Sequence, residues 1–506
     1  MKPQGLRLSS LDILRGFALF GMILSGIEPS GLPLWMYHVQ VPPGKGFDPT
    51  IPGIGWVDLV FPFFMFSLGA AIPFALTRRM ESNESVWKIL GHVSWRSILM
   101  CFFALYLGHY SPWSYGVDPN LYPWIRWRTL AGFFCLVLLL GRIPWTDGKK
   151  WLSGLIKVIG FAGIATLLVT YKRFDEATGL WTSAFSGDNN DIIILILARS
   201  YILIALLWMV TRKRLDLRLC LLGIFVALRL HGEAGGPFAD IVNQWISSGS
   251  WHGRIMGLFP AMAQHPMLVN FTLPLKWFFD PGIFRIATIC LMGSIVGDVM
   301  FKWLKEYKQN PGSLGLDKAR LTLLLVLLPM LTIGGLYFFY TRQIVTGFIA
   351  TSLAFIAIHG LLTATDTPMG KLVKQLCYFG TLFLLLGYIL DPVGGGIKKD
   401  PATLSYYFAP SGMATTLLAF LFILVDDLKF GKVFSLFRGA GCNAMLGYIA
   451  GGHFLFPILH LVGLIPLVDK LWGNNVSVYF LFTVALTLGA MAVTAGFTRL
   501  KLYLRV

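Results

Sequence analysis

Charged residues are scarce in this chain, because only 13% of its 506 residues are Asp, Glu, Lys or Arg. Soluble domains contain about 25% charged residues, so this composition argues against a soluble protein. The chain also shows no low-complexity segment, heptad array or short repeat, which argues against coiled coils and solenoids. The fold therefore has to be sought among membrane proteins.

Cysteine is scarce as well. The six cysteines are scattered singly, mostly inside apolar runs, and none shows CxxC or other metal-binding spacing. We interpret them as small core residues. His231, His252 and His265 lie far apart in sequence with no cysteine nearby, which argues against a zinc site. We therefore expect no metal.

What the chain has in abundance is long apolar runs, since 56% of its residues are hydrophobic. A run of about 17 to 25 residues crosses the hydrocarbon core of a bilayer. Such runs lie near residues 17–35, 55–77, 92–109, 127–141, 152–170, 191–210, 217–231, 281–300, 321–340, 343–364, 376–391, 403–425, 442–463 and 477–497. We predict an all-α, polytopic integral membrane helix bundle of roughly 11–14 transmembrane helices.

We expect one integral-membrane domain over residues 1–506. It comprises an N-terminal motif region at 1–145, an outer loop at 231–280 that caps the bundle as a lid, and a C-terminal motif region at 320–506. No A-x-A cleavage site follows the first apolar run, so we expect the first helix to be a retained anchor.

Orientation follows from the basic residues, because short loops rich in Lys and Arg stay in the cytoplasm. With the N-terminus inside, the predicted inner loops contain Arg78, Arg79, Arg142, Lys149, Lys150, Arg212, Lys213, Arg214, Lys302, Lys305, Lys308, Lys371, Lys374, Lys429 and Lys432. The basic C-terminus is then also cytoplasmic, and an even number of spans is favoured. The formal charge of +17 reflects this bias and attraction to anionic inner-leaflet lipid, and gives no argument for nucleic acid.

His38 and Asp58 are the first candidates for chemistry. His38 follows an aromatic membrane exit on the predicted outer face and precedes a Pro/Gly-rich loop. A neutral imidazole there can take a proton from an acceptor or carry an acyl group, although it can also simply bond a loop carbonyl. Asp58 begins the second span, where it can orient His38, hold a substrate amine, or only cap the helix.

Arg7, Asp12 and Arg15 lie at the predicted inner mouth of the first helix. Asp12 and Arg15 are three residues apart on one helix face, so an internal ion pair is one explanation. The alternative is that Arg7 and Arg15 hold an anionic donor, because guanidinium groups match phosphates.

Two later segments carry further candidates. GGGIKKDPATLSY places Lys398 and Lys399 on the predicted outer face, against the positive-inside trend, ahead of a helix beginning near Ser405. GCNAMLGY opens a later span with Asn443, which is available for a buried hydrogen bond or for packing through small residues.

Together these pieces resemble the heparan-alpha-glucosaminide N-acetyltransferase family, a branch of the transmembrane acyltransferases. The pieces are RLSSLDILRGFALFGMIL, the histidine before the second span, WVDLVFPFFMFSLG, IKKDPATLSY and GCNAMLGY. The resemblance implies that cytoplasmic acetyl-CoA acylates an amino sugar or glycan on the opposite face. His38 matches the family's active-site histidine, and the other matching positions are Arg7, Asp12, Arg15, Asp58, Lys399, Ser405, Asn443 and Tyr448.

The leading hypothesis is therefore an acyl-CoA-dependent transmembrane N-acyltransferase in which His38 and Asp58 are catalytic. Arg7, Asp12, Arg15 and Asn443 are the expected donor-binding residues. Lys398, Lys399, Ser405 and Tyr448 are the expected acceptor-binding residues. Acyl-CoA, an amino sugar or glycan acceptor and membrane lipid are the expected partners, and a homodimer remains open.

Two alternatives come from other classes. One is a transporter or permease for a glycan or acyl compound, for which the sequence offers no repeat between its halves. The other is a non-catalytic helper in envelope assembly, suggested by Gly26, where the family often has an asparagine. A bacterial inner membrane is the expected location.

Overall fold

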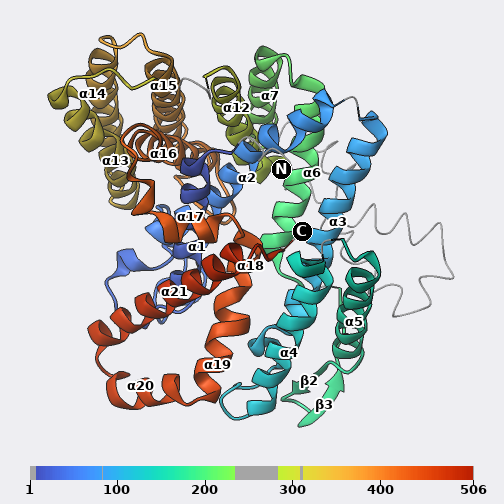
Figure 1. Ribbon diagram of the computed structural model, residues 1–506. Helices are drawn as coiled ribbons and strands as arrows, with labels where there is room; N and C mark the ends of the chain where they lie inside the picture. The colour runs from blue at the N-terminus through green and yellow to red at the C-terminus, as the bar shows by residue number, and fades with distance from the viewer. Residues whose placement is uncertain are drawn as a thin grey trace.

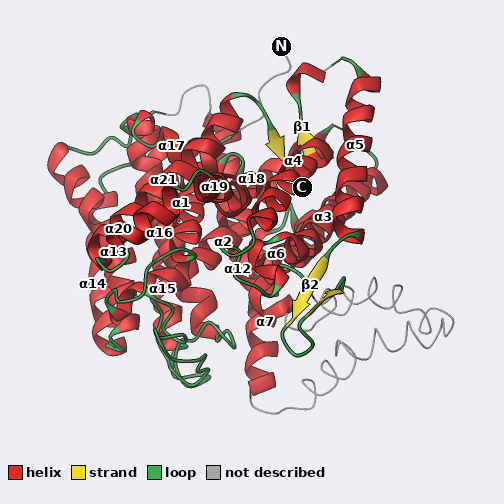
Figure 2. Cartoon of the chain, turned by 90° about the horizontal axis from the view of Figure 1, so that it is seen from below, coloured by secondary structure: helices red, strands yellow, loops and turns green. Residues whose placement is uncertain are grey.

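The computed structural model describes residues 7–82, 84–146, 148–187, 189–233, 283–307 and 312–504. Figure 2 shows that helices make up most of this part of the chain, with only short strands. Twelve of its helices are long and apolar enough to cross a membrane, judged by length and composition. The predicted all-α polytopic bundle is confirmed. Most of the predicted outer loop at 231–280, including His252 and His265, lies outside the described residues.

The first half of the chain forms seven helices joined by connections of different lengths. They are α1 (Ser9–Ser25), α2 (Trp56–Glu81), α3 (Val86–Tyr110), α4 (Pro123–Leu140), α5 (Lys150–Val169), α6 (Ile192–Thr211) and α7 (Leu215–Glu233). The short elements among them are η1 (Leu34–Met36), η2 (Pro112–Tyr115), β1 (Gly141–Arg142), η3 (Pro144–Thr146), β2 (Lys172–Asp175) and β3 (Leu180–Ser183).

The second half contains longer helices followed by a run of short ones. They are α12 (Ile283–Tyr307), α13 (Lys318–Tyr340), α14 (Ile344–Leu362), α15 (Pro368–Ile389), α16 (Leu404–Phe422), α17 (Ser435–Gly441), α18 (Ala444–Ile449), α19 (Phe456–Leu461), α20 (Leu464–Trp472) and α21 (Val476–Arg499). The connecting pieces are η4 (Ile423–Asp427), η5 (Phe430–Lys432), η6 (Ala450–Leu455) and the terminal strand β4 (Tyr503–Leu504).

The predicted first span, 17–35, is wrong in its bounds. The helix begins at Ser9 and ends at Ser25, and a loop follows as far as Gly55. Gly26, Pro29 and Pro33 explain the early stop, because glycine and proline are poor helix formers and proline lacks a backbone N–H. His38 therefore lies in this loop, beyond the end of the helix.

The centre of the bundle is formed by α2, α12 and α16, whose apolar windows are largely buried. In Figure 1, α13, α14 and α15 stand at one edge, and α4, α5 and the β2–β3 hairpin stand at the other. The C-terminal helices α17 and α21 pack on α1, so the two ends of the chain meet. The early sequence motif in α1 therefore lies close to the late motif that begins at the end of α17.

Small residues let α2 and α12 approach closely. A Cβ atom at Gly293 would collide with the carbonyl oxygen of Phe66, and one at Gly297 would collide with that of Ala70. From the other side, a Cβ atom at Gly69 would collide with the carbonyl oxygen of Cys290. Such small-residue contacts are typical of membrane helix pairs, because they allow the backbones to touch.

We expect Gly293→Leu to destabilise the protein by about 3 kcal/mol, because its side chain would force α2 and α12 apart. Thermal unfolding of the purified protein in detergent checks this. Gly360→Leu on α14 is the matched control, since no atom lies within 4 Å of a Cβ at Gly360. Equal melting temperatures for the two variants would contradict the assigned contact.

Candidate active site

His38 and Asp58 are in direct contact. His38 Nδ1 lies 2.7 Å from Asp58 Oδ1. The Asp58 side chain is only 4% exposed, whereas that of His38 is 35% exposed. The carboxylate is therefore held inside the protein, while the imidazole reaches toward its surface.

Asp58 owes its position to the start of α2. Its Oδ2 accepts a hydrogen bond from the Gly55 N–H at 2.9 Å, so the carboxylate also caps the helix. A Cβ atom at Gly55 would lie 2.9 Å from the Tyr37 carbonyl oxygen, so glycine lets the two segments approach. The Tyr406 hydroxyl donates to the Asp58 carbonyl oxygen at 2.8 Å. Both sequence-based explanations of Asp58, helix cap and partner of His38, are thus met by different oxygens of one carboxylate.

Lys399, from the loop before α16, lies next to this pair. Its Nζ lies 3.4 Å from His38 Nδ1. Burial lowers the pKa of the Lys399 ammonium, and the neighbouring Asp58 carboxylate opposes part of that shift. Three of the predicted site residues therefore meet at one point, although Lys399 lies more than 300 residues after His38 and Asp58 in the sequence.

Gln40 connects these two loops. Its Oε1 accepts hydrogen bonds from the backbone N–H groups of Lys399 and Asp400, and its Nε2 donates to the Asp400 carbonyl oxygen at 2.6 Å. The side chain of Gln40 is buried. One amide group thus satisfies three backbone groups and fixes Lys399 relative to His38.

The glycine-rich turn before Lys399 is held by an ion pair. Arg342 donates to both oxygens of Asp391 at 2.8 and 2.7 Å, and Asp391 Oδ1 also accepts from the Ile397 N–H. Gly396 has a φ of +97°, and a Cβ there would lie 2.6 Å from Pro52. These contacts fix the conformation of the turn and so the position of Lys399, which follows it.

The contact with Asp58 determines what the imidazole can do. A carboxylate beside Nδ1 favours the tautomer with the proton on Nδ1, which leaves the lone pair on Nε2. No described residue makes a hydrogen bond to Nε2. The arrangement suits His38 to accept a proton or an acyl group at Nε2.

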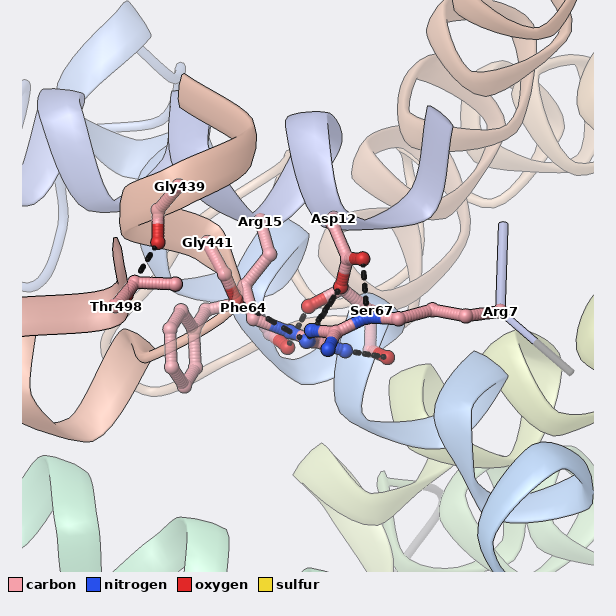
Figure 3. A network of polar contacts seen from close by, with 8 residues as sticks. All are labelled: Arg7, Asp12, Arg15, Phe64, Ser67, Gly439, Gly441 and Thr498. Atoms are coloured by element: carbon pink, nitrogen blue, oxygen red, sulfur yellow. Dashed lines mark hydrogen bonds and ion pairs between the residues drawn. The ribbon is translucent and has the colours of Figure 1, made fainter. Parts of the chain in front are cut away.

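The predicted inner-mouth residues form a second cluster, shown in Figure 3. Arg7 donates to both oxygens of Asp12, at 2.5 and 3.0 Å. Arg15 lies 3.4 Å from Asp12 and also donates to the carbonyl oxygens of Gly441 and Ser67. The predicted ion pair between Asp12 and Arg15 is present, so Asp12 offsets part of the positive charge there.

Asn443 holds the end of the chain. Its Nδ2 donates to the Leu502 carbonyl oxygen at 2.7 Å, and its Oδ1 accepts from the Leu504 N–H at 3.2 Å. Strand β4 also pairs with β1, which sets Leu504 opposite Gly141. The amide of Asn443 therefore positions the C-terminal strand.

The remaining predicted residues are engaged elsewhere. The Ser405 hydroxyl donates to the Gly387 carbonyl oxygen at 2.7 Å, and the Tyr448 hydroxyl donates to Asp191 at 2.7 Å. The Lys398 N–H donates to Thr403. No hydrogen bond among the described residues joins their side chains to His38 or Asp58.

Two neighbouring cavities lie along α2. The larger, of about 990 Å³, is lined by five basic side chains and by no Asp or Glu among the described residues. These are Arg79, His92, Arg96, Arg142 and Lys157. The smaller, of about 200 Å³, is lined by Arg15 and Asn443. Arg96, Tyr201 and Leu504 line both cavities, so the C-terminal strand lies at their boundary.

Sequence reasoning missed Gln40, Tyr406 and the basic lining of the larger cavity. Nothing in the sequence marked Gln40 as important, because a single glutamine in a loop belongs to no recognisable motif or spacing. Arg79 and Arg142 were assigned to topology alone, and Arg96 and Lys157, which stand within apolar runs, were not singled out. An ionisable residue inside such a run is expensive and is a signal of function.

Comparison with known proteins places these motifs in a wider context. Residues 7–258 match the model of a domain of unknown function, DUF5009. Heparan-alpha-glucosaminide N-acetyltransferase of Homo sapiens is 31% identical over 94 residues, covering 19% of this chain and 12% of that protein. The enzyme of the same name from Mus musculus is 24% identical over 183 residues, covering 36% of this chain and 22% of that protein.

The resemblance that the motifs suggested is thus confirmed at the level of a distant relationship. The aligned segments span less than a quarter of these relatives, so the relationship concerns part of each protein. The chain is an integral membrane helix bundle, and it is distantly related to the heparan-alpha-glucosaminide N-acetyltransferases.

Proposed function

We propose that this protein is a membrane-bound acyltransferase that moves an acetyl group from cytoplasmic acetyl-CoA to the amine of an amino sugar or glycan on the outer face. The observation that carries the proposal is the placement of the His38–Asp58 pair at one end of α2, whose other end borders the basic cavity. The Nε2 of His38, which is bonded by no described residue, and the distant relationship to N-acetyltransferases also support this proposal.

The length of α2 fits a reaction across a membrane. About 32 Å of helix separates Asp58 from Arg79, at about 1.5 Å per residue. That is close to the hydrocarbon thickness of about 30 Å. A donor held at Arg79 and an acceptor held at His38 would therefore lie on opposite sides of the bilayer.

The two cavities offer the donor a passage along α2. Phe64, Leu68, Ala71 and Ala75 line the smaller cavity, and Ala75 and Arg79 line the larger. These spacings place the side chains on one helix face. The passage ends at Phe64, within about 9 Å of helix from Asp58. An extended pantetheine arm suits such a narrow path, with its phosphates left at the basic entrance.

The basic cavity matches the chemistry of a coenzyme A nucleotide. Arg and Lys bind phosphate oxygens through charge-assisted hydrogen bonds. Arg96 also lies over the Tyr201 ring, with 5.0 Å from its guanidinium carbon to the ring centroid. We assign the phosphates to this cavity and keep Arg7, Asp12, Arg15 and Asn443 as the support of the passage beyond it.

The reaction balances with His38 as the base. The acceptor nitrogen attacks the thioester carbonyl, the C–N bond forms, the C–S bond breaks, and Nε2 takes the proton that the nitrogen loses. The coenzyme A thiolate leaves and then receives that proton. An alternative order, in which Nε2 first carries the acetyl group, uses the same atoms. Lys399 would stabilise the negative carbonyl oxygen that develops, because its charge lies beside the pair.

The proposed acceptor site also includes Lys398, Ser405 and Tyr448. Ser405 and Tyr448 would act on it indirectly, because their hydroxyls fix the packing of α16 on α15 and of α18 near the start of α6. We place both chain ends in the cytoplasm of a bacterial cell, with the chain in its inner membrane. Arg15 of the first helix and Leu504 of the last strand line the same smaller cavity, which agrees with both ends lying on one side.

A sided assay tests the proposal. Protein is reconstituted into liposomes, [¹⁴C]acetyl-CoA is supplied on one side only, and a panel of amino sugars is supplied on the other. We expect labelled product to form across the membrane with equal release of coenzyme A. Uptake of an amino sugar without coenzyme A release would instead favour the transporter. The absence of both product formation and uptake would favour the non-catalytic helper.

A further inference from the structure

An apolar groove of about 440 Å³ lies beside the candidate active site. It is formed by α1, η1 and the first two turns of α2, with Leu417 from α16 and Phe480 from α21. None of its lining residues is charged, and their only side-chain N–H groups are the indoles of Trp35 and Trp56. We call this site the outer groove. Its lining suits hydrocarbon and offers almost nothing to a sugar.

The residues that line the outer groove include sequence neighbours of both His38 and Asp58. Met36 lines it two residues before His38, and Leu59 lines it next to Asp58. The close approach of Gly55 to the Tyr37 carbonyl oxygen holds η1 against the start of α2. A molecule with its chain in the groove would therefore have its other end near the loop that carries His38.

One polar atom in the lining has no partner. The Trp56 Nε1 is buried and makes no hydrogen bond with any described residue. A buried N–H without an acceptor is unfavourable, so an acceptor supplied by a ligand would be favoured. Trp56 is the first residue of α2, at the level of His38, where the polar end of an amphipathic molecule would lie.

We propose that the outer groove binds the hydrocarbon chain of a lipid-anchored acceptor. Its ester, glycosidic or phosphate oxygen accepts from Trp56, and its amino sugar reaches His38. This inference rests on the proposed acyltransfer and names the acceptor class. The reaction is the same N-acylation, with the C–N bond formed on the amine of the lipid-linked sugar and coenzyme A released.

The geometry favours an acceptor chain over a long acyl chain of the donor. The groove uses Trp56, Val60 and Phe63 of α2, whereas the donor passage uses Phe64, Ala71 and Ala75. At about 100° per residue these two sets lie about a quarter turn apart on the helix. The rim residue Trp35 is 53% exposed, so the groove opens outward at the level where a bilayer lipid can enter.

The test compares glucosaminides with one sugar and either a methyl or a decyl aglycone, using the full-length protein in lipid nanodiscs. We expect wild type to show a KM for the decyl compound at least tenfold below that for the methyl compound. Ala18→Phe fills the groove and should reduce this ratio at least fivefold. Leu481→Trp adds similar bulk at a position 67% exposed on α21, and should keep the wild-type ratio.

A second measurement does not depend on turnover. A decyl glucosaminide with a terminal diazirine is photolysed in the nanodiscs, and the labelled peptides are mapped. We expect labelling of Leu24, Met36 or Phe63, and at least threefold less labelling in Trp56→Phe, which keeps the ring and removes the N–H. This second variant protects the test if Ala18→Phe does not fold.

The outcomes are distinct. Equal KM ratios in Ala18→Phe and Leu481→Trp, or label spread evenly over α13 and α14, would overturn the outer groove as an acceptor site. Groove labelling by a diazirine-bearing long-chain acyl-CoA, but not by the glucosaminide, would assign the groove to the donor and also overturn it. If wild type releases no coenzyme A with any acceptor, the proposed acyltransfer fails, whereas groove labelling can still succeed.

Discussion

His38→Ala is expected to lower kcat/KM for acetyl transfer by about 10³-fold, because a positioned general base contributes about 10²–10⁴-fold to a proton-transfer step. The loss should appear in kcat, since the imidazole acts on the reacting nitrogen and binds neither substrate tightly. Release of coenzyme A from acetyl-CoA in the presence of an amino sugar measures it. The melting temperature reports whether the fold is kept.

Two variants sharpen this result. Asp58→Asn keeps the shape of the partner and removes its charge, so we expect about a 10²-fold loss with the fold retained. His359→Ala is the matched control, because His359 lies at the end of another predicted span and contacts Tyr378 instead. Full activity of His38→Ala, with wild-type melting behaviour, would remove the imidazole from the mechanism.

Lys157→Glu is expected to raise the KM for acetyl-CoA about tenfold. The change replaces attraction to a phosphate by repulsion, and a charged hydrogen bond contributes about 1.5 kcal/mol or more. The kcat at saturating donor and the KM for the acceptor should stay close to wild type, since the basic cavity lies at the far end of α2 from His38. Initial rates over a range of acetyl-CoA concentrations measure the effect.

The effect should also depend on salt. Raising ionic strength screens exposed charges, so the difference between wild type and Lys157→Glu should shrink at high salt. Lys318→Glu is the matched control, because Lys318 is an exposed lysine at the start of α13 and lines neither cavity. The same rise of KM in both variants would show a general charge effect and would contradict a donor site in this cavity.

Part of the candidate site was predictable from local sequence. Asp12 and Arg15 pair because residues three apart share a helix face, and Asp58 caps α2 because a carboxylate in the first turn meets free N–H groups. The contact between His38 and Asp58 was predicted only as one option among several. The loop between α1 and α2 holds too many Gly and Pro residues for its path to follow from sequence.

The composition and spacing of apolar residues by themselves determined that this chain is a helical membrane protein, and its short motifs determined the distant relationship. Tertiary structure alone decided that Lys399 lies beside His38, that five basic side chains from four segments line one cavity, and that α1, η1 and the start of α2 enclose an apolar groove. The reason is physical. Apolar runs and helix caps are local properties, whereas these arrangements depend on how closely whole helices approach, as Gly293 against Phe66 allows.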